Sequence, residues 1–357
     1  MVRAAYAMES LGIGILGFAH GHAHAYATRI ATFDDATLVT AWDHDSARGE
    51  EGATRHGMEF MPDLESLLAR SDIHAVIVTS ETNLHADLVE RACAAGKHIL
   101  CQKPMATTLA DCDRIIAAVD RAGIHFQMAF QMRCDPLNRQ IKQWIDDGAV
   151  GRVCAVRRRH CINFLFNPNL KSGPSAWHVD PVANVGMFFD DAVHAADFLY
   201  WLFGIPDTVM AEIDNVLTDV APDDTGIALY RWKDGPMGTL FNGSAIVAGI
   251  NTCEIYGDQG TIVQDYDDLV STPHAVGGGP ALRLFRRDSG TWESFEHTVP
   301  ASHGERLQAV PRPWIDDIRA GRPSSVTARD GRISVAMCLA AYESARTGRR
   351  ISIGDIV

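Results

Sequence analysis

The sequence lacks an excess of positive charge. Its 32 Lys and Arg are outnumbered by 45 Asp and Glu, and the formal net charge is -13 at pH 7. A surface that neutralises nucleic-acid phosphates or anionic lipid needs clustered basic side chains. We therefore expect no nucleic-acid partner and no membrane partner.

Closely spaced cysteine pairs and long apolar runs near the N terminus are also missing. The eight cysteines show no Cys-x-x-Cys spacing, which is typical of reduced thiols in a cytoplasmic protein. The first apolar run, Leu11–Phe18, is short and interrupted by glycine. It predicts a strand and argues against a signal peptide or a membrane span. We expect a cytoplasmic protein.

No internal repeat and no low-complexity linker divides the chain. With 357 residues, 46% of them hydrophobic and 22% charged, it is typical of globular proteins and long enough for two domains. A change of pattern after residue 133 sets the expected boundary. We expect an α/β domain over residues 1–133 and an α+β domain over residues 134–357, whose last helices can pack back on the first domain.

Apolar runs alternate with amphipathic helical stretches in the first third of the chain. Helices are expected at Leu84–Ala95, which Gly96 ends, and at Leu109–Ala122. The apolar runs predict strands at Leu11–Leu16, Thr37–Trp42, Ala75–Thr79, His98–Cys101 and Ile124–Ala129. This strand–helix–strand order predicts a parallel, doubly wound sheet of the Rossmann type.

The pattern after about Pro136 predicts a different architecture. Short strands separated by turn residues run from Asp207 to about Thr298, which indicates a large, mostly antiparallel sheet with helices on one face. Before it we expect a helix, an Arg-rich strand, a loop and a second helix, at Leu137–Asp147, Arg152–Cys161, Asn163–Asn184 and Phe189–Leu202. Two last helices are expected at about Gly304–Ala320 and Asp330–Thr347.

The turn after the first strand is a candidate dinucleotide site. Gly12 and Gly14 fit G-x-G-x-x-G by letter, but they lie inside the strand, whereas the fingerprint glycines follow the strand and open the helix. The better register starts after the strand, and its candidate cofactor residues are Gly17, Phe18, Ala19, His20 and His22. The alternative is a tight strand-to-helix turn that binds nothing.

The end of the second strand bears on the choice of cofactor. Asp43 stands 26 residues after Gly17, roughly where an acidic side chain accepts hydrogen bonds from the adenosine ribose hydroxyls. A carboxylate there repels a 2′-phosphate, which favours NAD over NADP. Asp43 can also merely end a strand, and the nearby His44 and Arg48 leave the choice open.

Three histidines, His20, His22 and His24, suggest a metal site by composition. Because they span a turn and a helix start, alternate side chains point in different directions. We therefore expect no metal, and we expect one or two of these histidines to face the nicotinamide or the substrate.

Two stretches around the later strands resemble a known family. Residues 75–85 read AVIVTSETNLH and residues 95–104 read AGKHILCQKP. They are similar to the T-P-N-x-x-H, A-G-K-H-V and E-K-P motifs of the Gfo/Idh/MocA (glucose-fructose oxidoreductase, inositol dehydrogenase, rhizopine catabolism) family, with Glu81 and Gln102 in place of the usual Pro and Glu. Residues 186–197, GMFFDDAVHAAD, resemble its G-x-x-x-D-x-x-x-H-x-x-D helix, and the likeness extends to residues 341–349. The resemblance implies an NAD-dependent oxidoreductase with further cofactor contacts from Ser80, Glu81, His85, Gln102 and Lys103.

The expected catalytic residues are Lys103, Asp190 and His194. Lys103 follows a parallel strand at the carboxyl edge of the sheet, where an ammonium can stabilise developing charge on a reacting oxygen; by itself it would be a solvated lysine. Asp190 and His194 share one helix face, as a supporting carboxylate and a base do. The resemblance assigns proton transfer to His194, and to Asp190 substrate binding or orientation of that His. The alternative is an Asp near a helix N terminus and a satisfied core His.

The resemblance also suggests substrate contacts outside this helix. Trp177, His178 and Asp180 stand where relatives often carry sugar-contacting residues. Arg133 matches a recurrent family Arg, with a structural ion pair as the alternative. His160 and Asn163 can line the sheet under the substrate or be exposed strand residues.

Together these residues predict an enzyme that moves a hydride to or from a secondary alcohol carbon of a sugar, inositol or glycoside, with NAD as cofactor. One alternative is glycoside cleavage through transient oxidation of the sugar. Another is a non-catalytic NAD-binding regulator, against which the retention of Lys103 and His194 argues. Because a broad sheet face is usually covered, we expect a homodimer or homotetramer paired through the C-terminal domain, as in the family.

Overall fold

The computed structural model describes residues 10–168, 170–249, 251–265, 280–297, 303–354 and 356. The chain forms two compact units, of which the first comprises Met1–Gln131 and Gly304–Arg332 and the second Met132–His303 and Ile333–Val357. In the described ranges, no helix combines the length and the apolar character that crossing a bilayer requires. A division into functional domains at residue 133 stays a prediction.

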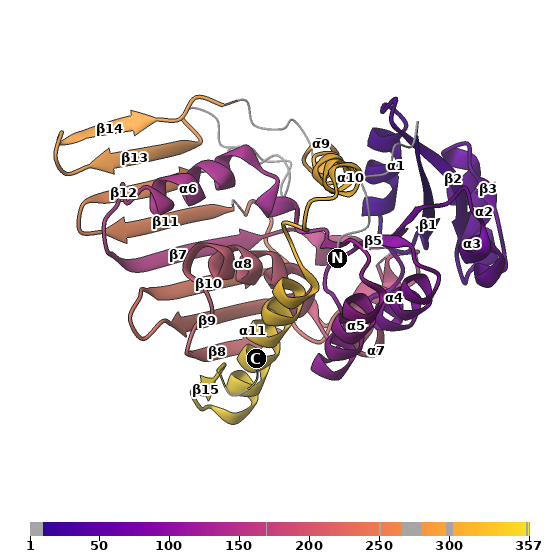
Figure 1. Ribbon diagram of the computed structural model, residues 1–357. Helices are drawn as coiled ribbons and strands as arrows, with labels where there is room; N and C mark the ends of the chain where they lie inside the picture. The colour runs from indigo at the N-terminus through magenta and orange to yellow at the C-terminus, as the bar shows by residue number, and fades with distance from the viewer. Residues whose placement is uncertain are drawn as a thin grey trace. The chain divides into compact units, whose positions relative to one another are not determined.

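A six-stranded parallel sheet forms the centre of the first unit (Figure 1). Its order is β3-β2-β1-β4-β5-β6, and the strands are β1 (Leu11–Leu16), β2 (Ala36–Trp42), β3 (Glu59–Phe60), β4 (Ala75–Val78), β5 (His98–Cys101) and β6 (Phe126–Met128). The chain winds outward from β1 to β3 and then from β4 to β6, so right-handed crossovers place helices on both faces. The predicted doubly wound sheet is confirmed.

The helices of this unit follow the strands in regular alternation. They are α1 (His22–Ile30), α2 (Ser46–Arg55), α3 (Leu64–Ala69), α4 (His85–Ala94) and α5 (Leu109–Ala122). Every residue of β1 and of β4 is buried, as expected for parallel strands covered on both faces. Gly96, just after α4, has a φ of 70°, so the predicted left-handed glycine is present.

A segment from near the C terminus completes the first unit. The backbone N–H of Met128 in β6 donates to the carbonyl of Val326 at 2.9 Å. Helix α10 (Pro311–Ala320) packs against α1, and Arg312 of α10 pairs with Asp35 at 2.8 Å. Two parts of the chain that are separated by 277 residues are therefore joined in one unit.

The expectation of one helix over about Gly304–Ala320 is wrong. Helix α9 (His303–Leu307) ends first, and α10 begins at Pro311. Proline has no N–H to continue the hydrogen bonds of a helix, but its fixed φ suits the first helical position. The spacing of apolar residues alone predicts one helix, whereas the proline starts a second one.

A nine-stranded sheet forms the second unit, in the order β14-β13-β12-β11-β7-β10-β9-β8-β15. Among the described pairs only β7 and β10 are parallel, so the predicted mostly antiparallel sheet is confirmed. The strands are β7 (Val153–Cys161), β8 (Thr208–Asp214), β9 (Thr225–Arg231), β10 (Met237–Gly243), β11 (Thr252–Gly257), β12 (Gly260–Asp265), β13 (Leu282–Arg286), β14 (Thr291–Ser294) and β15 (Ile351–Ser352).

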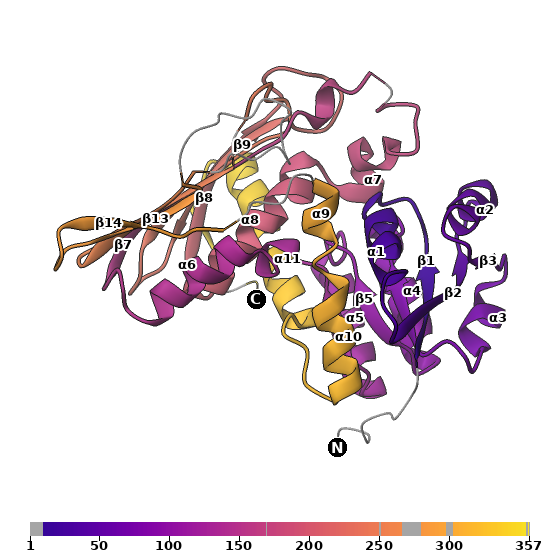
Figure 2. The same cartoon turned by 90° about the horizontal axis from the view of Figure 1, so that it is seen from above.

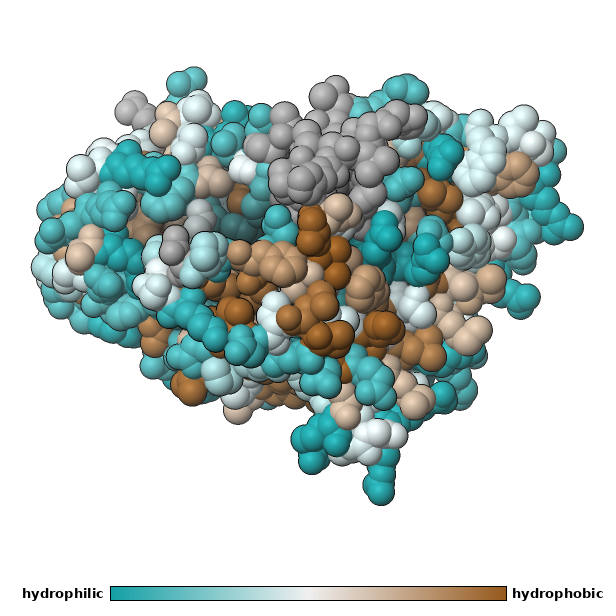
Figure 3. All heavy atoms as spheres, turned by 180° about the vertical axis from the view of Figure 1, so that it is seen from behind, coloured by the Kyte–Doolittle hydropathy of each residue, from teal (hydrophilic) through white to brown (hydrophobic). Residues whose placement is uncertain are grey.

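Helices cover one face of this sheet (Figure 2). They are α6 (Pro136–Asp146), α8 (Met187–Phe203) and most of α11 (Ala328–Thr347). Gly226 of β9 faces α8 so closely that a Cβ would lie 2.3 Å from the ring of Phe188. In β8, β9 and β10 every second side chain points away from these helices, and the exposed apolar ones on that open face are Met210, Ile227, Leu229 and Met237. Figure 3 shows that hydrophobic residues gather on the surface seen from behind the view of Figure 1.

Candidate active site

The carboxyl ends of β1 and β4 form the switch point at which the strand order of the parallel sheet reverses. Gly17 follows β1 with a φ of 95°, and a Cβ on it would lie 2.8 Å from the backbone of Ser80, which follows β4. Only glycine permits this approach. Doubly wound sheets bind dinucleotides at this edge, so the predicted cofactor turn stands at the appropriate place.

Hydrogen bonds to both neighbouring strand ends hold the turn that follows β1. The N–H of Phe18 donates to Asp43 Oδ2 at 2.7 Å, and the N–H of His20 donates to the carbonyl of Thr79 at 3.0 Å. Gly12 and Gly14 lie within β1, which leaves Gly17 as the glycine of the turn. The fixed backbone is ready to receive a ligand without further ordering.

The start of α1 suits the pyrophosphate of a dinucleotide. No side chain caps this helix at Gly21, and a Cβ on Gly21 would meet no atom within 4 Å. The N–H groups of His22 and Ala23 donate within the turn, to Nδ1 and to the carbonyl of His20 at 3.4 and 3.1 Å, so the helix dipole remains as the attraction for an anion at this end. Ala19 is buried in the turn, where it takes the place of a fingerprint glycine. The residues at this edge therefore fit NAD.

Gln102 organises the polypeptide around Lys103. Its Oε1 accepts from the N–H of Lys103 at 2.8 Å, and its Nε2 lies 2.8 Å from His22 Nδ1 and 3.2 Å from the hydroxyl of Tyr26. Because the amide nitrogen only donates, His22 Nδ1 is an acceptor and carries no proton. Lys103 is 3% exposed, so the alternative of a solvated lysine is wrong.

His85 holds the loop that carries Lys103. Its Nδ1 lies 3.0 Å from the carbonyl of Pro104, and its Nε2 lies 3.3 Å from the carbonyl of Ser80. The Lys103–Pro104 peptide bond is cis. Burial lowers the pKa of His85 to about 4, so the imidazole is neutral at physiological pH. A neutral imidazole has one N–H and both carbonyls only accept, so the shorter contact, to Pro104, is the one we take as a hydrogen bond. The predicted cofactor residue His85 thus has a structural contact with the loop after β5.

The histidines after β1 point in different directions, as expected. The rings of His20 and His22 meet edge to face at 4.1 Å, and His22 is bonded to Gln102. His24 turns away to bond His56 at 2.9 Å and stacks on Phe18. Over the described residues, no three His, Cys, Asp or Glu side chains gather in a way that could hold a metal ion.

In the second unit, α8 carries an unusual number of buried ionisable groups. Asp190 is 2% exposed and His194 is 4% exposed, and both lie on a helix that is otherwise mostly apolar. Asp191 accepts a hydrogen bond from the hydroxyl of Ser244 at 2.5 Å. Burying such groups costs free energy unless they are paired, so their concentration on one helix indicates a functional site.

The N terminus of α8 is anchored by Asp223. Its carboxylate accepts from the N–H of Phe188 at 2.7 Å and from the hydroxyl of Tyr342 at 2.7 Å. Burial raises the pKa of Asp223, although the bond from Tyr342 acts in the opposite direction. A Cβ on Gly186 would lie 2.1 Å from this carboxylate, so glycine is required just before the helix. These contacts fix the position of Asp190.

His178 is the residue bonded to Asp190. Its Nδ1 lies 2.6 Å from Asp190 Oδ2, and its ring stacks on Trp177 at 3.7 Å. An ionised carboxylate only accepts, so the imidazole holds its proton on Nδ1. The expected loop Asn163–Asn184 contains short helical turns, among them η4 (Ala176–Val179), which carries Trp177 and His178. The sequence grouped His178 with the substrate residues; the structure joins it to a predicted catalytic residue.

His160 lies near His194, at the end of β7. The two rings are 5.9 Å apart, and His160 is 9% exposed, so the alternative of an exposed strand residue is wrong for His160. Asn163 follows the strand, at the start of the turn η3 (Phe164–Phe166). The structure therefore gathers His160, His178, Asp190 and His194 within the second unit.

Two of the predicted substrate residues make structural contacts. Arg133 forms a buried, bidentate pair with Asp197 at 2.9 and 2.6 Å, which is the ion pair left open as an alternative. Asp180 is exposed, and it caps α7 (Pro181–Asn184) by accepting from the N–H of Val182 at 2.8 Å. Substrate binding by either residue stays a prediction.

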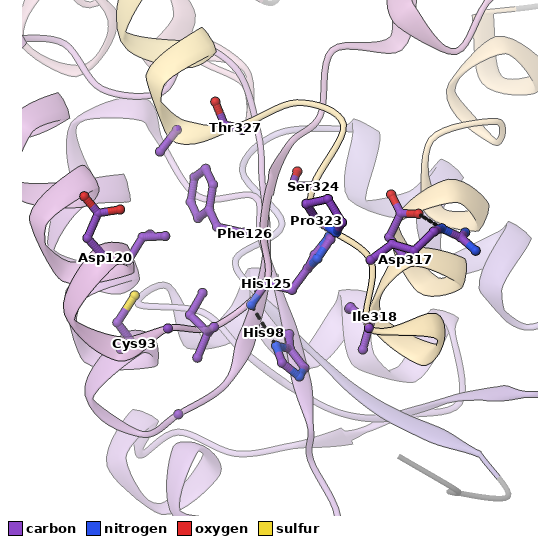
Figure 4. A pocket seen from close by; sticks show the side chains of 18 of the residues that line it. Cys93, His98, Asp120, His125, Phe126, Asp317, Ile318, Pro323, Ser324 and Thr327 are labelled. Carbon is purple, nitrogen blue, oxygen red and sulfur yellow. Dashed lines mark hydrogen bonds and ion pairs between the residues drawn. The ribbon is translucent and has the colours of Figure 1, made fainter. Parts of the chain in front are cut away.

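A cavity of about 680 Å³ lies at the opposite edge of the first unit's sheet (Figure 4). It borders the amino ends of β5 and β6, where His98 and His125 point into it. Two acids in its wall are paired with arginines, Asp120 with Arg329 and Asp317 with Arg322. It is distinct from the cofactor edge, because dinucleotides bind at carboxyl ends.

Comparison with known proteins assigns the chain to a family. Residues 11–130 match a family described as "Oxidoreductase family, NAD-binding Rossmann fold", and residues 138–263 match the "GFO/IDH/MocA C-terminal domain". The chain belongs to the GFO/IDH/MocA family. The family prediction, NAD as the cofactor and the assignment as an NAD-dependent oxidoreductase are thereby confirmed.

Two similar proteins and one solved structure match 73% or more of this chain. Myo-inositol 2-dehydrogenase from Thermotoga maritima is 25% identical over 97% of this chain and 98% of its own. Levoglucosan dehydrogenase from Pseudarthrobacter phenanthrenivorans is 27% identical over 73% of this chain and 75% of its own. A solved structure of levoglucosan dehydrogenase with NADH and levoglucosan has a TM-score of 0.82 at 24% identity, covering 96% of this chain and 99% of that one. This last likeness shows the fold alone.

Proposed function

We propose that this GFO/IDH/MocA oxidoreductase transfers a hydride between NAD and a secondary alcohol carbon of a sugar, inositol or glycoside. The observation that carries the proposal is the buried pair of His178 and Asp190, at 2.6 Å, of which Asp190 lies on the same helix as His194. The printed names of relatives support the substrate class, because they include inositol 2-dehydrogenases, levoglucosan dehydrogenase and 1,5-anhydro-D-fructose reductase.

The side chains of the second unit supply proton handling and recognition of hydroxyls. NAD, when bound, accepts or returns the hydride. His194 takes the proton of the substrate hydroxyl, as a base must when a carbinol is oxidised. Asp190 and His178 bind further hydroxyls, since a carboxylate accepts from them and His178 Nε2 can accept as well. Trp177 supplies an apolar surface for the sugar ring.

Lys103 acts from the first unit. Its ammonium donates to the reacting oxygen and stabilises negative charge that develops there. Gln102 fixes the backbone of this residue through a 2.8 Å bond, and His85 fixes the carbonyl that follows. The backbone that carries the side chain is therefore held on both sides, which reduces the cost of ordering this residue for the reaction.

A substrate screen tests the proposal. The purified protein is incubated with NAD and with inositols, hexoses or glycosides, and the absorbance of the reduced nicotinamide is followed. Net formation of NADH with a cyclic polyol or sugar is expected. Release of an aglycone without net NADH would instead identify a glycoside-cleaving enzyme, and NAD binding without turnover of any of these compounds would contradict the proposed activity.

We propose further that the protein is a homodimer or homotetramer of the cytoplasm. The open face of the second unit's sheet exposes Met210, Ile227, Leu229 and Met237, and apolar side chains gathered on one sheet face are typical of an interface between subunits. The eight cysteines are all free thiols, which suits a reducing compartment.

A further inference from the structure

The carboxylate expected to receive the adenosine ribose is already paired with an arginine. Arg48, in the first turn of α2, donates from Nε to Asp43 Oδ2 at 2.8 Å and from Nη2 to Asp43 Oδ1 at 2.7 Å. The N–H groups of Phe18 and Asp45 donate to the same two oxygens. A carboxylate has about four acceptor positions, so all those of Asp43 are filled. A ribose hydroxyl must therefore replace one of the bonds from Arg48.

A second carboxylate, that of Glu81, pairs with the remaining terminal nitrogen of the same arginine. Glu81 follows β4, and its Oε1 lies 3.0 Å from Arg48 Nη1. Its Oε2 lies 3.6 Å from His44 Nδ1, and the side chain is 12% exposed. Burial acts to lower the pKa of Arg48, but Asp43 and Glu81 together raise it above its usual value. The arginine is thus charged and is bridged between two carboxylates.

The charges of this cluster bear on the choice between NAD and NADP. Asp43 and Glu81 carry two negative charges and Arg48 carries one positive charge, which leaves a net negative charge when His44 is neutral. Opposite charges at this distance interact strongly where water is partly excluded. A 2′-phosphate would need a free arginine, yet the arginine at this site is engaged on both sides.

We propose that Glu81 is a specificity-determining residue that excludes NADP by holding Arg48 and by adding a negative charge beside the ribose site. In the first of these effects it is a positioning residue, because that effect passes through Arg48. The proposal concerns cofactor binding and does not depend on the identity of the substrate. It adds Glu81, which stands where the resemblance has proline, to Asp43 as a residue that favours NAD in this chain.

Binding measurements on the full-length protein test the proposal. Isothermal titration calorimetry with NAD and with NADP is carried out on the wild type, Glu81→Gln and Arg48→Gln. Glu81→Gln is expected to raise the affinity for NADP about tenfold or more while the affinity for NAD changes by less than about threefold. Arg48→Gln is expected to lower the affinity for NADP, because two unneutralised carboxylates then face the phosphate.

The double variant separates the two parts of the mechanism. If Glu81 acts by holding Arg48, most of the gain in NADP affinity disappears in Glu81→Gln/Arg48→Gln. A gain that persists in full there would overturn the role of Arg48, and an unchanged ratio of NADP to NAD affinity in Glu81→Gln would overturn the proposal. Glu50→Gln is the matched control, since Glu50 is exposed on α2; it should leave the ratio unchanged.

Discussion

His178 and Asp190 are joined by a 2.6 Å bond between Nδ1 and Oδ2, although twelve residues and a change of secondary structure separate them. His178 comes from a short helical turn and Asp190 from α8. The pair supplies the second unit with an imidazole and a carboxylate in one place, and Asp190 lies on the helix that also carries His194.

The pair predicts coupled effects of substitution. His178→Ala leaves the buried Asp190 carboxylate without this partner, which should cost about 1–3 kcal/mol of unfolding free energy and raise KM for the substrate. Asp190→Asn should have a similar effect, and the double variant should cost less than the sum. Urea unfolding and steady-state kinetics measure both quantities. Strictly additive losses would show that the two side chains act independently.

Lys103 and His194 should affect the rate rather than cofactor binding. Lys103→Ala and His194→Ala are each expected to lower kcat by about 10²–10⁴, the range for a positioned acid or base. NAD affinity should hardly change. Lys142→Ala and His297→Ala are the controls, since Lys142 lies on the surface of α6 and His297 is exposed. A folded His194→Ala variant with full turnover would refute the assignment, and an unfolded one would make His194 a core residue.

Buried histidines predict how stability depends on pH. Burial lowers the pKa of His85 to about 4, and burial followed by the charge of His125 does the same for His98. In the unfolded chain both titrate near pH 6.5, so between about pH 4 and 6.5 the unfolded state binds more protons. The contribution of these histidines to the free energy of unfolding is therefore complete above about pH 6.5. It decreases as the pH falls toward 4, by on the order of 3 kcal/mol per histidine.

Urea unfolding across this pH range measures the dependence, monitored by circular dichroism. His85→Gln should reduce the slope, because one of the groups that take up a proton on unfolding is removed. His297→Gln, on an exposed histidine, should leave it unchanged. A His85→Gln variant with the wild-type slope would mean that other groups cause the loss at low pH.

The open face of the second unit predicts the oligomeric state. Leu229→Asp places a charge among exposed apolar side chains, and it should reduce the mass measured by light scattering at micromolar concentration to that of a monomer. Leu217→Asp is the matched control, because Leu217 is exposed outside the strands of this sheet. A wild-type protein that is already monomeric at this concentration would contradict the proposal.

Gln102 predicts a change in the titration of His22. In Gln102→Glu the buried carboxylate only accepts, so His22 must bring a proton on Nδ1, and its pKa should rise. Histidine resonances followed by NMR across pH 5–8 measure this shift, a range chosen around the usual histidine pKa of about 6.5. An unchanged His22 titration would mean that the side chain of residue 102 does not contact His22 in the folded protein.

Apolar periodicity predicted most of the helices and strands. It failed where glycine replaces an apolar side chain and where loop residues set the contacts. The bounds of β1, β5 and α5 agree with the runs that predicted them. Helix α2 is not singled out by such a run, because Gly49 and Gly52 stand where a Cβ would lie 2.3 and 2.5 Å from the rings of Phe60 and Phe18. Close packing there replaces the apolar side chains that a pattern detects.

The candidate site was predicted less completely than the fold. Spacing placed Asp190 and His194 on one helix, since i and i+4 positions share a face. It could not show that Asp190 bonds His178, because loop residues have no periodicity that fixes where they point. The pairing of Arg48 with Glu81 was missed for the same reason, although opposite charges near two strand ends were visible in the sequence.

The bond between Met128 and Val326, together with the pair of Arg312 and Asp35, has a consequence for biosynthesis. While the ribosome is still making the second unit, the nascent first unit lacks α10 and the strand-edge partner of β6. The first unit can complete its fold only after residue 332 has left the exit tunnel. Until then the apolar surface that α10 covers is exposed and can bind chaperones. A fragment ending at residue 133 would remain permanently in that unfinished state.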